Sequence, residues 1–339
     1  MNNGNIPVIT VEGKSLAETY EKALLALHEK GQRIKTQYDN PKDPASIDAT
    51  MNMTVLEPLS DPMIHKCFVG GISDLREYVY ELEGLKDCIC RNENDPKDTR
   101  WEYLYSSRMT NYGTWLMKME KEDADMISCV PSDSANPNII THKDIVAKYE
   151  DGSLGIRVGD FNINQVDAVV EKLTKQPFTR QAQMITWMPN IDLKQYDPPC
   201  LQSLWFRITT DENGKMWLNT NIRFRSNDAY KANFMNFFGF IQFIDHKIRQ
   251  PVEKNLGKEI GFGRINWQAD SFHIYGKDIA DFETRFLKRV ANSEFSDRVY
   301  EFYDEYIQEM YHENENAIVQ KFEDIKHGCG IKTNGEKNV

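Results

Sequence analysis

The segment from residue 234 to 248 is apolar on nearly every side when it is drawn as a helix. A surface helix carries a polar face, so a helix without one has to be enclosed by other elements. We therefore expect this segment at the centre of a core, which a chain of 339 residues is long enough to build. Asn236 is one of its few polar residues, and a buried amide needs hydrogen-bonding partners.

Helical and strand-like patterns on both sides of this segment predict a mixed α/β protein. Ser15 and Glu18 have the spacing of a capping box before an amphipathic run that stops near Gly31. Residues 211–214 have turn composition between two strand-like runs, which predicts a hairpin. No repeat, low-complexity tract or long linker interrupts the sequence, so we expect a single domain over 1–339. Further helices are expected over 162–177, 279–292 and 297–322, strands over 184–187, 204–209, 216–225 and 260–275, and loops over 36–50, 91–99 and 129–145.

The charge balance and the hydropathy restrict the partners of this chain. Lys and Arg number 41 against 52 Asp and Glu, and the net charge of −11 disfavours non-specific binding to nucleic acid. No stretch approaches the roughly 20 apolar residues of a membrane span. The first residues lack the basic and apolar regions of a signal peptide. We therefore expect a cytoplasmic protein with no nucleic-acid and no membrane partner.

The six cysteines do not form a metal-binding pattern. No C-x-x-C occurs, and the pairs Cys88 with Cys90 and His327 with Cys329 lack a second pair at zinc-site spacing. We expect no metal site, and the thiols of a cytoplasmic protein should be reduced.

Cys200 carries the strongest chemical signal among these thiols. It follows two prolines just before a strand-like run, and such a rigid presentation suits a nucleophile. Arg225 and Ser226 end another strand-like run shortly before the apolar helix. A guanidinium near a thiol lowers the pKa of that thiol and also binds phosphate through two N–H groups. The alternatives are a core cysteine and an arginine in a surface ion pair.

These residues belong to an ordered series of motifs that resembles the series of the thymidylate synthases and the related pyrimidine-nucleotide hydroxymethylases. The match is best over 162–275, and upstream the segments 76–80 and 101–108 resemble the family's catalytic-glutamate segment and its tyrosine-containing loop. The resemblance implies an α/β (α+β) fold with a mixed sheet flanked by helices, and a homodimer formed through the sheet face with shared active sites. The motifs are Asn164-Gln165, Pro177-Phe178-Thr179-Arg180, Trp187-x-Pro189, Pro198-Pro199-Cys200, Arg225-Ser226-x-Asp228, Asn236, and Asp270 with His273-Ile274-Tyr275.

The resemblance also implies a covalent one-carbon transfer to a pyrimidine. The thiolate of Cys200 adds to C6 of a pyrimidine nucleoside 5′-monophosphate, and C5 then attacks the methylene of the cofactor, 5,10-methylenetetrahydrofolate. The implied substrate contacts are the 5′-phosphate with Arg225, Ser226 and the second subunit's Arg180, the base with Asn236, and the sugar with His273 and Tyr275. The other implied catalytic residues are Glu77, which orders water, Tyr105, which assists loss of the C5 proton, Asp228, which contacts the pterin of the folate, and again Asn236.

Each assignment has a structural alternative. These alternatives are a satisfied core amide for Asn236, a strand contact for His273, a solvated helix face for Glu77, Tyr103 in place of Tyr105, and an ion pair between Asp228 and Arg225.

Several positions depart from the usual synthase pattern. Leu201 replaces a histidine, Ala232 and Phe234 replace a glycine and a proline, and Gln181 replaces an arginine. The tail over about 325–339 is polar, unlike the apolar end with which synthases close over folate. A methylene on C5 gives a methyl group with hydride and a hydroxymethyl group with water, and a site that seals less against water favours the second.

The expected reaction is therefore C5 hydroxymethylation, and the expected base is uracil. The amide of Asn236 donates to O4 and accepts from N3–H of uracil, which favours dUMP. The alternatives are a dCMP or CMP hydroxymethylase, a divergent thymidylate synthase that makes dTMP, a non-catalytic nucleotide-binding homologue, and an unrelated thiol enzyme such as a hydrolase.

Overall fold

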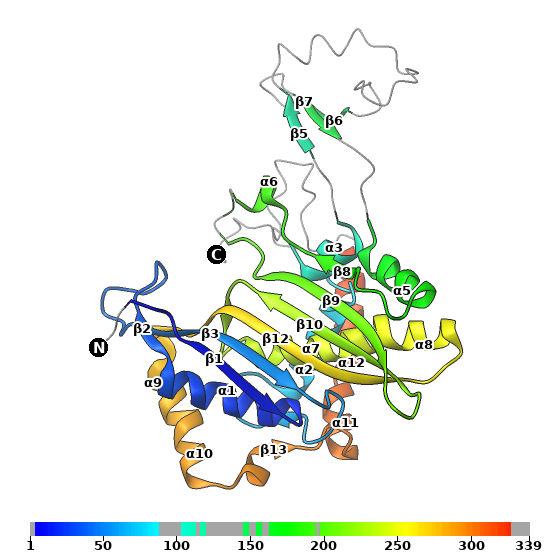
Figure 1. Ribbon diagram of the computed structural model, residues 1–339. Coiled ribbons are helices and arrows are strands. Elements are labelled where there is room, and N and C mark those ends of the chain that lie inside the picture. Colours follow the sequence, from blue (N-terminus) through cyan, green and yellow to red (C-terminus); the bar gives the residue numbers. More distant parts are fainter. Residues whose placement is uncertain are drawn as a thin grey trace, which may run out of the picture.

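One mixed sheet of eight strands organises the chain in the computed structural model, which describes residues 4–87, 103–112, 116–119, 145–148, 154–157, 163–193, 195 and 197–326. The strands follow the order β1-β3-β12-β10-β9-β8, with β2 beside β3 and β11 beside β12 (Figure 1). The pairs β1–β3, β10–β12 and β11–β12 are parallel and the others are antiparallel. The predicted mixed α/β architecture is confirmed. The bounds are β1 Val8–Gly13, β2 Gln32–Ile34, β3 Ser46–Val55, β8 Ala182–Ile185, β9 Leu201–Thr210, β10 Met216–Phe224, β11 Asn227–Asp228 and β12 Ile260–Ile274.

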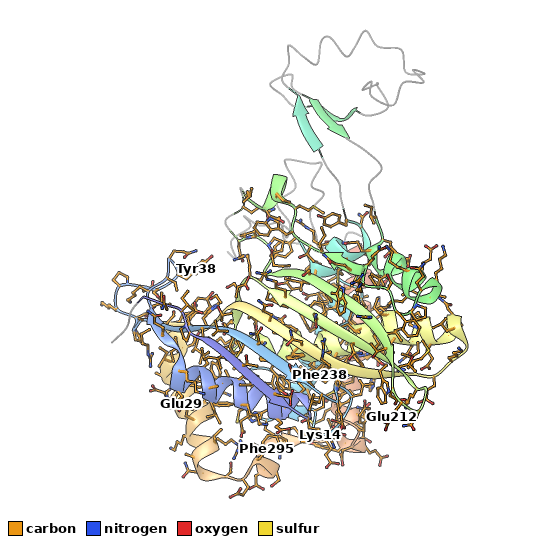
Figure 2. All side chains as sticks on the ribbon, in the orientation of Figure 1. Lys14, Glu29, Tyr38, Glu212, Phe238 and Phe295 are labelled. Atoms are coloured by element: carbon orange, nitrogen blue, oxygen red, sulfur yellow. The ribbon has the colours of Figure 1, made fainter. Side chains whose placement is uncertain are left out.

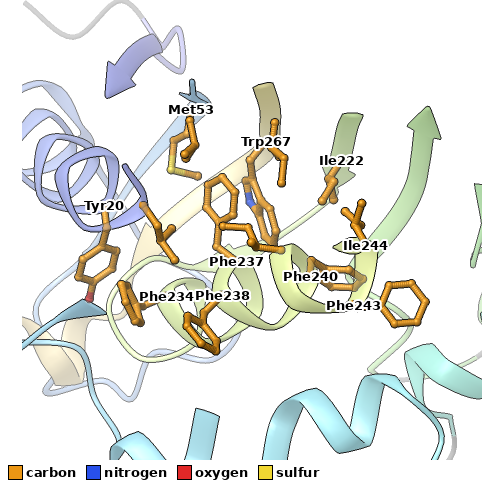
Figure 3. Packing of buried hydrophobic residues seen from close by; sticks show 14 of the residues in the cluster. Tyr20, Met53, Ile222, Phe234, Phe237, Phe238, Phe240, Phe243, Ile244 and Trp267 are labelled. Atoms are coloured by element: carbon orange, nitrogen blue, oxygen red, sulfur yellow. The ribbon is translucent and has the colours of Figure 1, made fainter. Parts of the chain in front are cut away.

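The apolar segment forms the core helix α7 (Asn233–Ile244), which continues as a π-helical turn over Asp245–Arg249. The indole of Trp267 on β12 stacks on the ring of Phe224 from β10 at 4.4 Å and on the ring of Phe237 from α7 at 4.5 Å. These side chains are buried, and Figure 3 shows Phe237 directed from α7 toward Trp267. The expected burial of the segment is therefore confirmed. The stacked rings form one core between the helix and the sheet.

Two further helices pack on the sheet, and a third packs on α7. Helix α1 (Leu16–Lys30) packs on β1 and β3, α5 (Gln165–Lys175) packs on β8 and β9, and α2 (Ile72–Leu82) packs on α7, behind the sheet in Figure 1. Helix α1 begins and ends where its sequence predicts. The expected capping box is not formed, because Ser15 makes no side-chain cap and the carboxylate of Glu18 accepts from the backbone N–H of Lys14, the residue before the N-cap, at 2.7 Å.

The opposite face of the sheet is polar and partly exposed. Strands β10 and β12 alternate between buried residues that face the helices and partly exposed residues on the other side. Arg223 and Asp270 form an ion pair of 3.0 Å on that side. Other partly exposed side chains of this face are Trp205, Arg207, Asn219, Asn221, Asn266 and Gln268.

The remaining elements lie outside the main sheet. A small sheet of β5, β7 and β6 lies apart from the main sheet in Figure 1, and β4 pairs with β13. None of the helices in the described ranges has the length and apolarity needed to cross a membrane. The bounds are β4 Ile64–His65, α3 Tyr105–Thr110, β5 Leu116–Met119, β6 Ile145–Lys148, β7 Leu154–Arg157, α6 Pro189–Asp192, α8 Gln250–Leu256, α9 Ile279–Asp281, α10 Lys288–Asn292, β13 Val299–Tyr300, α11 Glu305–His312 and α12 Glu315–Lys326.

Two sequence expectations about these elements were wrong. The loop expected over 36–50 ends early, because residues from Ser46 onward belong to the central strand β3. The helix expected over 297–322 is interrupted, because residues 299 and 300 pair with β4 and Asp304 caps a new helix by accepting from the N–H of Tyr306.

A buried charged cluster ties the first helix to the segment before β13. Both carboxylate oxygens of Glu21 on α1 accept from Arg298, at 2.7 and 2.8 Å, and one of them lies 2.9 Å from Nε2 of His65. Burial acts to raise the pKa of Glu21, but the hydrogen bonds with His65 and Arg298 outweigh it and lower this pKa to about 2. Glu21 is therefore ionised at neutral pH.

Candidate active site

Cys200 lies at the end of a loop, directly before β9, where hydrogen bonds with the residue after β10 and with helix α3 fix the backbone. Its carbonyl accepts from the backbone N–H of Arg225 at 2.8 Å, and the N–H of the next residue, Leu201, donates to the hydroxyl of Tyr105 at 3.4 Å. Burial raises the pKa of the Cys200 thiol, and Arg225 offsets only part of this effect. The expected lowering of this pKa by the arginine is thus outweighed, and the thiol is protonated at neutral pH.

Two cavities of about 490 and 550 Å³ meet at Cys200, because Asp197, Cys200 and Ser226 line both. The first is mostly apolar, whereas the lining of the second is about half polar, and we call them the apolar and the polar cavity. The first is also lined by Tyr78, Glu81, Tyr103, Leu104, Tyr105, Asn227, Ala232 and Asn236. The second is also lined by Thr36, Gln37, Tyr38, Asp48, Arg225, Ser271, His273, Tyr275 and Lys277.

Arg225 binds the prolines that precede the cysteine. Its Nε donates to the carbonyl of Pro199 at 3.0 Å, and its Nη2 donates to the carbonyl of Pro198. The alternative ion pair with Asp228 is not formed. One carboxylate oxygen of Asp228 accepts instead from the backbone N–H groups of Tyr230 and Lys231, and Asp228 lines neither cavity.

Asn236 projects from α7 into the apolar cavity, where Tyr78 from α2 binds it. The phenol of Tyr78 donates to Oδ1 of Asn236 at 2.5 Å. The ring of Tyr78 lies so close to Gly239 that a Cβ there would meet it at 2.5 Å, so this glycine permits the approach of the two helices. Tyr78 lies in the segment 76–80, but the sequence analysis assigned it no role, because its contact with the site depends on how α2 packs against α7.

The structure brings Glu81 of α2, and not Glu77, to the apolar cavity. Glu77 forms ion pairs with Lys86 at 2.8 Å and with Lys321 at 3.9 Å. Burial acts to raise the pKa of Glu77, but the hydrogen bond from Lys86 outweighs it and lowers this pKa. Lys86 also contacts Glu81, at 3.0 Å. The four-residue spacing places Glu77 and Glu81 on neighbouring parts of one helix face. The sequence alone therefore does not show which of the two carboxylates reaches the cavity.

Tyr103 and Tyr105 both line the apolar cavity, with ring centroids 5.9 Å apart. Burial raises the pKa of both phenols. The alternative between the two tyrosines therefore stays open, although Tyr105 is the one whose hydroxyl contacts the backbone next to Cys200.

His273 and Tyr275 reach the polar cavity from the end of β12, and both lie in the lining as expected. Oγ of Ser271 lies 3.2 Å from Nδ1 of His273 and donates to Asp48 at 2.7 Å. Tyr38, which is labelled in Figure 2, lies in the loop after β2 and packs edge-on against Tyr275. Asp48 and Ser271 were missed by the sequence analysis because strand pairing between β3 and β12 brings them together.

A buried ion pair anchors the segment that leads to the cysteine. Arg108 on α3 binds Asp192 at 2.9 Å and also donates to the carbonyl of Thr186. The second oxygen of Asp192 accepts from the N–H of Met188 at 2.6 Å. Removing one partner of such a buried pair costs about 3–5 kcal/mol, so Arg108 fixes the start of the loop.

Arg180 is exposed and lines neither cavity. Its carbonyl accepts from the indole N–H of Trp205 at 3.0 Å, which places Arg180 beside the polar face of the sheet. Among the departures from the synthase pattern, Leu201 and Phe234 are buried, Ala232 lines the apolar cavity and Gln181 is exposed. The tail beyond residue 326 lies outside the described residues, as does Trp101.

Comparisons with known proteins show the family of this chain. The model of the family "Thymidylate synthase" matches residues 101–311, more than half of the chain. The chain therefore belongs to the thymidylate synthase family. It is 37% identical over 121 residues to a protein of Methanocaldococcus jannaschii named "Putative thymidylate synthase", covering 34% of this chain and 49% of that protein. A protein of the same name from Methanothermobacter marburgensis is 33% identical over 115 residues, covering 34% and 46%.

The chain thus spans about half the length of the curated relatives it matches. Among solved structures, the thermostable thymidylate synthase A from Bacillus subtilis is similar with a TM-score of 0.45 and 13% identity, covering 80% of this chain and 83% of that one.

Proposed function

We propose that this chain transfers a one-carbon unit to C5 of a uracil nucleoside 5′-monophosphate and forms the 5-hydroxymethyl product, through a covalent bond between Cys200 and C6 of the base. The position of Cys200 carries this proposal, because it lies where a polar cavity with Arg225 meets an apolar cavity with Asn236. A nucleotide has the matching chemistry, with an anionic sugar phosphate at one end and a flat base at the other.

The polar cavity offers contacts for the sugar phosphate. Nε and Nη2 of Arg225 hold proline carbonyls, and Nη1 has no partner among the described residues, so its N–H groups are available to a phosphate. Ser226 adds a hydroxyl and Lys277 adds a second cation to the lining. Arg180 is exposed and outside both cavities, which fits a role at the phosphate of a second subunit in a homodimer.

The apolar cavity offers contacts for the base. Tyr78 uses one lone pair of Oδ1 of Asn236, so the other lone pair and both N–H groups of Nδ2 are left for a ligand. Uracil uses both ends of such an amide, because O4 accepts from Nδ2 and N3–H donates to Oδ1. By donating to Oδ1, the hydroxyl of Tyr78 favours one of the two orientations of the Asn236 amide.

Proton transfers accompany the covalent step. The Cys200 thiol has to lose its proton before sulfur adds to C6, and burial opposes this loss whereas Arg225 favours it. Glu81, in the lining of the apolar cavity, replaces Glu77 as the carboxylate proposed to order water for these transfers. Tyr105 is proposed to assist removal of the C5 proton.

The apolar cavity also fits a reduced folate. The rings of Tyr103 and Tyr105 suit stacking on a pterin, and the carboxylates of Glu81 and Asp197 suit its N–H donors. 5,10-Methylenetetrahydrofolate, when bound, supplies the one-carbon unit. The pterin contact that the resemblance assigns to Asp228 has less support, because this residue lines neither cavity.

The hydroxymethyl product is proposed because the residues around the cysteine depart from the synthase pattern. Leu201 stands where synthases have histidine, and Ala232 in the cavity lining replaces a glycine. The second candidate is a methyl product, which the names of the curated relatives favour.

One experiment separates these products. The protein is incubated with 5,10-methylenetetrahydrofolate and one of UMP, dUMP, CMP or dCMP. The mass of the nucleotide is then measured by mass spectrometry, and formation of dihydrofolate is followed by its absorbance. A hydroxymethyl mass without dihydrofolate supports the proposal. A methyl mass with equimolar dihydrofolate replaces it with thymidylate-type synthesis, and absence of any modified nucleotide contradicts the enzymatic function.

A further inference from the structure

A turn after α2 brings a lysine back beside this helix. Gly84 has a φ of 97°, in the left-handed region that favours glycine, and the N–H of the next residue donates to the carbonyl of Tyr80 at 2.9 Å. The turn places Nζ of Lys86 3.0 Å from Oε2 of Glu81 and 2.8 Å from Oε1 of Glu77. Lys86 therefore links the carboxylate in the lining of the apolar cavity to one that lines neither cavity.

Lys86 is also covered by helix α12. Its side chain is 14% exposed, and its Nζ lies 5.4 Å from the centre of the Phe322 ring. Burial acts to lower the pKa of Lys86, but the charges and hydrogen bonds of Glu81 and Glu77 outweigh burial and raise this pKa. Lys86 is therefore charged at neutral pH, and solvent screens its attraction to the carboxylates less than in an exposed pair.

The ion pair uses only one oxygen of the cavity carboxylate. Oε2 of Glu81 accepts from Lys86, whereas Oε1 has no hydrogen-bond partner among the described residues. The side chain of Glu81 is 24% exposed and lines the cavity, so water reaches this carboxylate. With Oε2 held by the lysine, Oε1 is left to accept a hydrogen bond from water.

We propose that Lys86 is a positioning residue for Glu81, which by binding Oε2 keeps the carboxylate ionised and fixes the direction of Oε1. This inference rests on the proposed function, in which Glu81 orders water for the proton transfers. A carboxylate in a mostly apolar cavity is costly to ionise without an opposite charge nearby. None of the described residues that line this cavity is Lys, Arg or His, so Lys86 supplies that charge from outside the lining.

The first test removes the charge of the lysine and then restores it. With the nucleotide that the wild type turns over, Lys86→Met should lower kcat by about 10- to 100-fold, the range for one hydrogen bond to a charged group. Lys86→Arg should recover most of this loss, and calorimetry should give both variants a nucleotide affinity within about threefold of the wild type. Lys22→Met is the control, because it removes a lysine that pairs with Glu18 on α1 and lines neither cavity.

The second test asks whether Lys86 acts through Glu81. If it does, adding Lys86→Met to Glu81→Gln should lower kcat by less than about threefold beyond Glu81→Gln alone, since the carboxylate to be positioned is already gone. A lysine that only stabilises the turn would lower kcat by the same factor in both backgrounds. Circular dichroism checks folding, and Lys86→Gln, which keeps a donor without the charge, replaces Lys86→Met if that variant does not fold.

The outcomes separate this inference from the proposed function. Full kcat in the folded, uncharged Lys86 variant of an active enzyme, or an equal loss in both backgrounds, would overturn the positioning role and leave the proposed function intact. A wild type that converts none of the nucleotides would contradict the proposed function, and the positioning role with it.

Discussion

The phenol of Tyr78 and the amide oxygen of Asn236 are joined by a hydrogen bond of 2.5 Å across the contact between α2 and α7. An asparagine amide presents a donor and an acceptor, and rotation by half a turn exchanges them. Because a phenol hydrogen is supplied to Oδ1, the orientation with oxygen toward Tyr78 is favoured. If Asn236 reads the base as proposed, base recognition depends on a helix other than the one that carries the asparagine.

We predict that Tyr78→Phe weakens the preference of the Asn236 amide for this orientation. The ratio of kcat/KM for the uracil nucleotide to that for the cytosine nucleotide should fall by about threefold to tenfold, the range for one neutral hydrogen bond. Tyr80→Phe is the matched control on the same helix, because the hydroxyl of Tyr80 contacts Glu315 and Arg76 and lines neither cavity. An unchanged ratio in Tyr78→Phe would show that the base is read without this contact.

We predict that Cys200→Ser abolishes turnover while nucleotide binding survives, since a hydroxyl is similar in size but far less nucleophilic than a thiolate. A 5-fluorouracil nucleotide with folate should add its mass to the wild-type protein and not to the variant. Cys67→Ser is the control, because Cys67 is absent from both cavities and should keep its adduct. Product formation by Cys200→Ser would refute the covalent mechanism.

We predict different effects for the two carboxylates of α2. Glu81→Gln should lower kcat by about 10²- to 10⁴-fold, the range for loss of a general acid–base group. Glu77→Gln should change kcat by less than about threefold, because Glu77 faces Lys86 and Lys321 outside the cavities. Both substitutions conserve size, so folding is checked by circular dichroism. The reverse order of the two effects would restore Glu77 as the catalytic carboxylate.

We predict that active sites are shared between two subunits. Arg180→Ala, weak alone, and Cys200→Ser, inactive alone, should regain part of the activity when mixed, because one hybrid site carries both intact residues. The refolded mixture is assayed against each variant treated in the same way. Turnover by a wild-type monomer in analytical ultracentrifugation would exclude the shared site.

We predict that the Glu21 cluster makes stability fall in acid. The folded-state pKa of Glu21, about 2, lies below its ordinary value of 4.5, so the carboxylate stabilises the fold above pH 4.5 and loses this contribution as pH falls toward 2. Glu21→Gln should lower the free energy of unfolding at pH 7 by about 3–5 kcal/mol, because Arg298 stays buried without its counter-charge. The difference between wild type and variant should shrink in urea titrations at pH 3, and a constant difference would contradict the assignment.

The core and half of the candidate site were predictable because they are local in the sequence. The apolar run of α7 has to be buried, and the motifs around Cys200, Arg225 and His273 place their side chains at the cavities through a few adjacent residues. Tyr78 and Asp48 were not predictable, because they reach the site through helix packing and strand register between segments far apart in the chain. The choice between Glu77 and Glu81 likewise depends on how α2 docks, which a four-residue spacing does not fix.

Arg225 holds the carbonyls of Pro198 and Pro199, the two residues directly before Cys200. If Arg225 also binds the phosphate as proposed, one side chain both recognises the substrate and positions the thiol of Cys200. During evolution these positions cannot change independently, since any replacement of the arginine would release the loop as well as the ligand. In an alignment of relatives we expect the arginine and the proline pair to be gained and lost together.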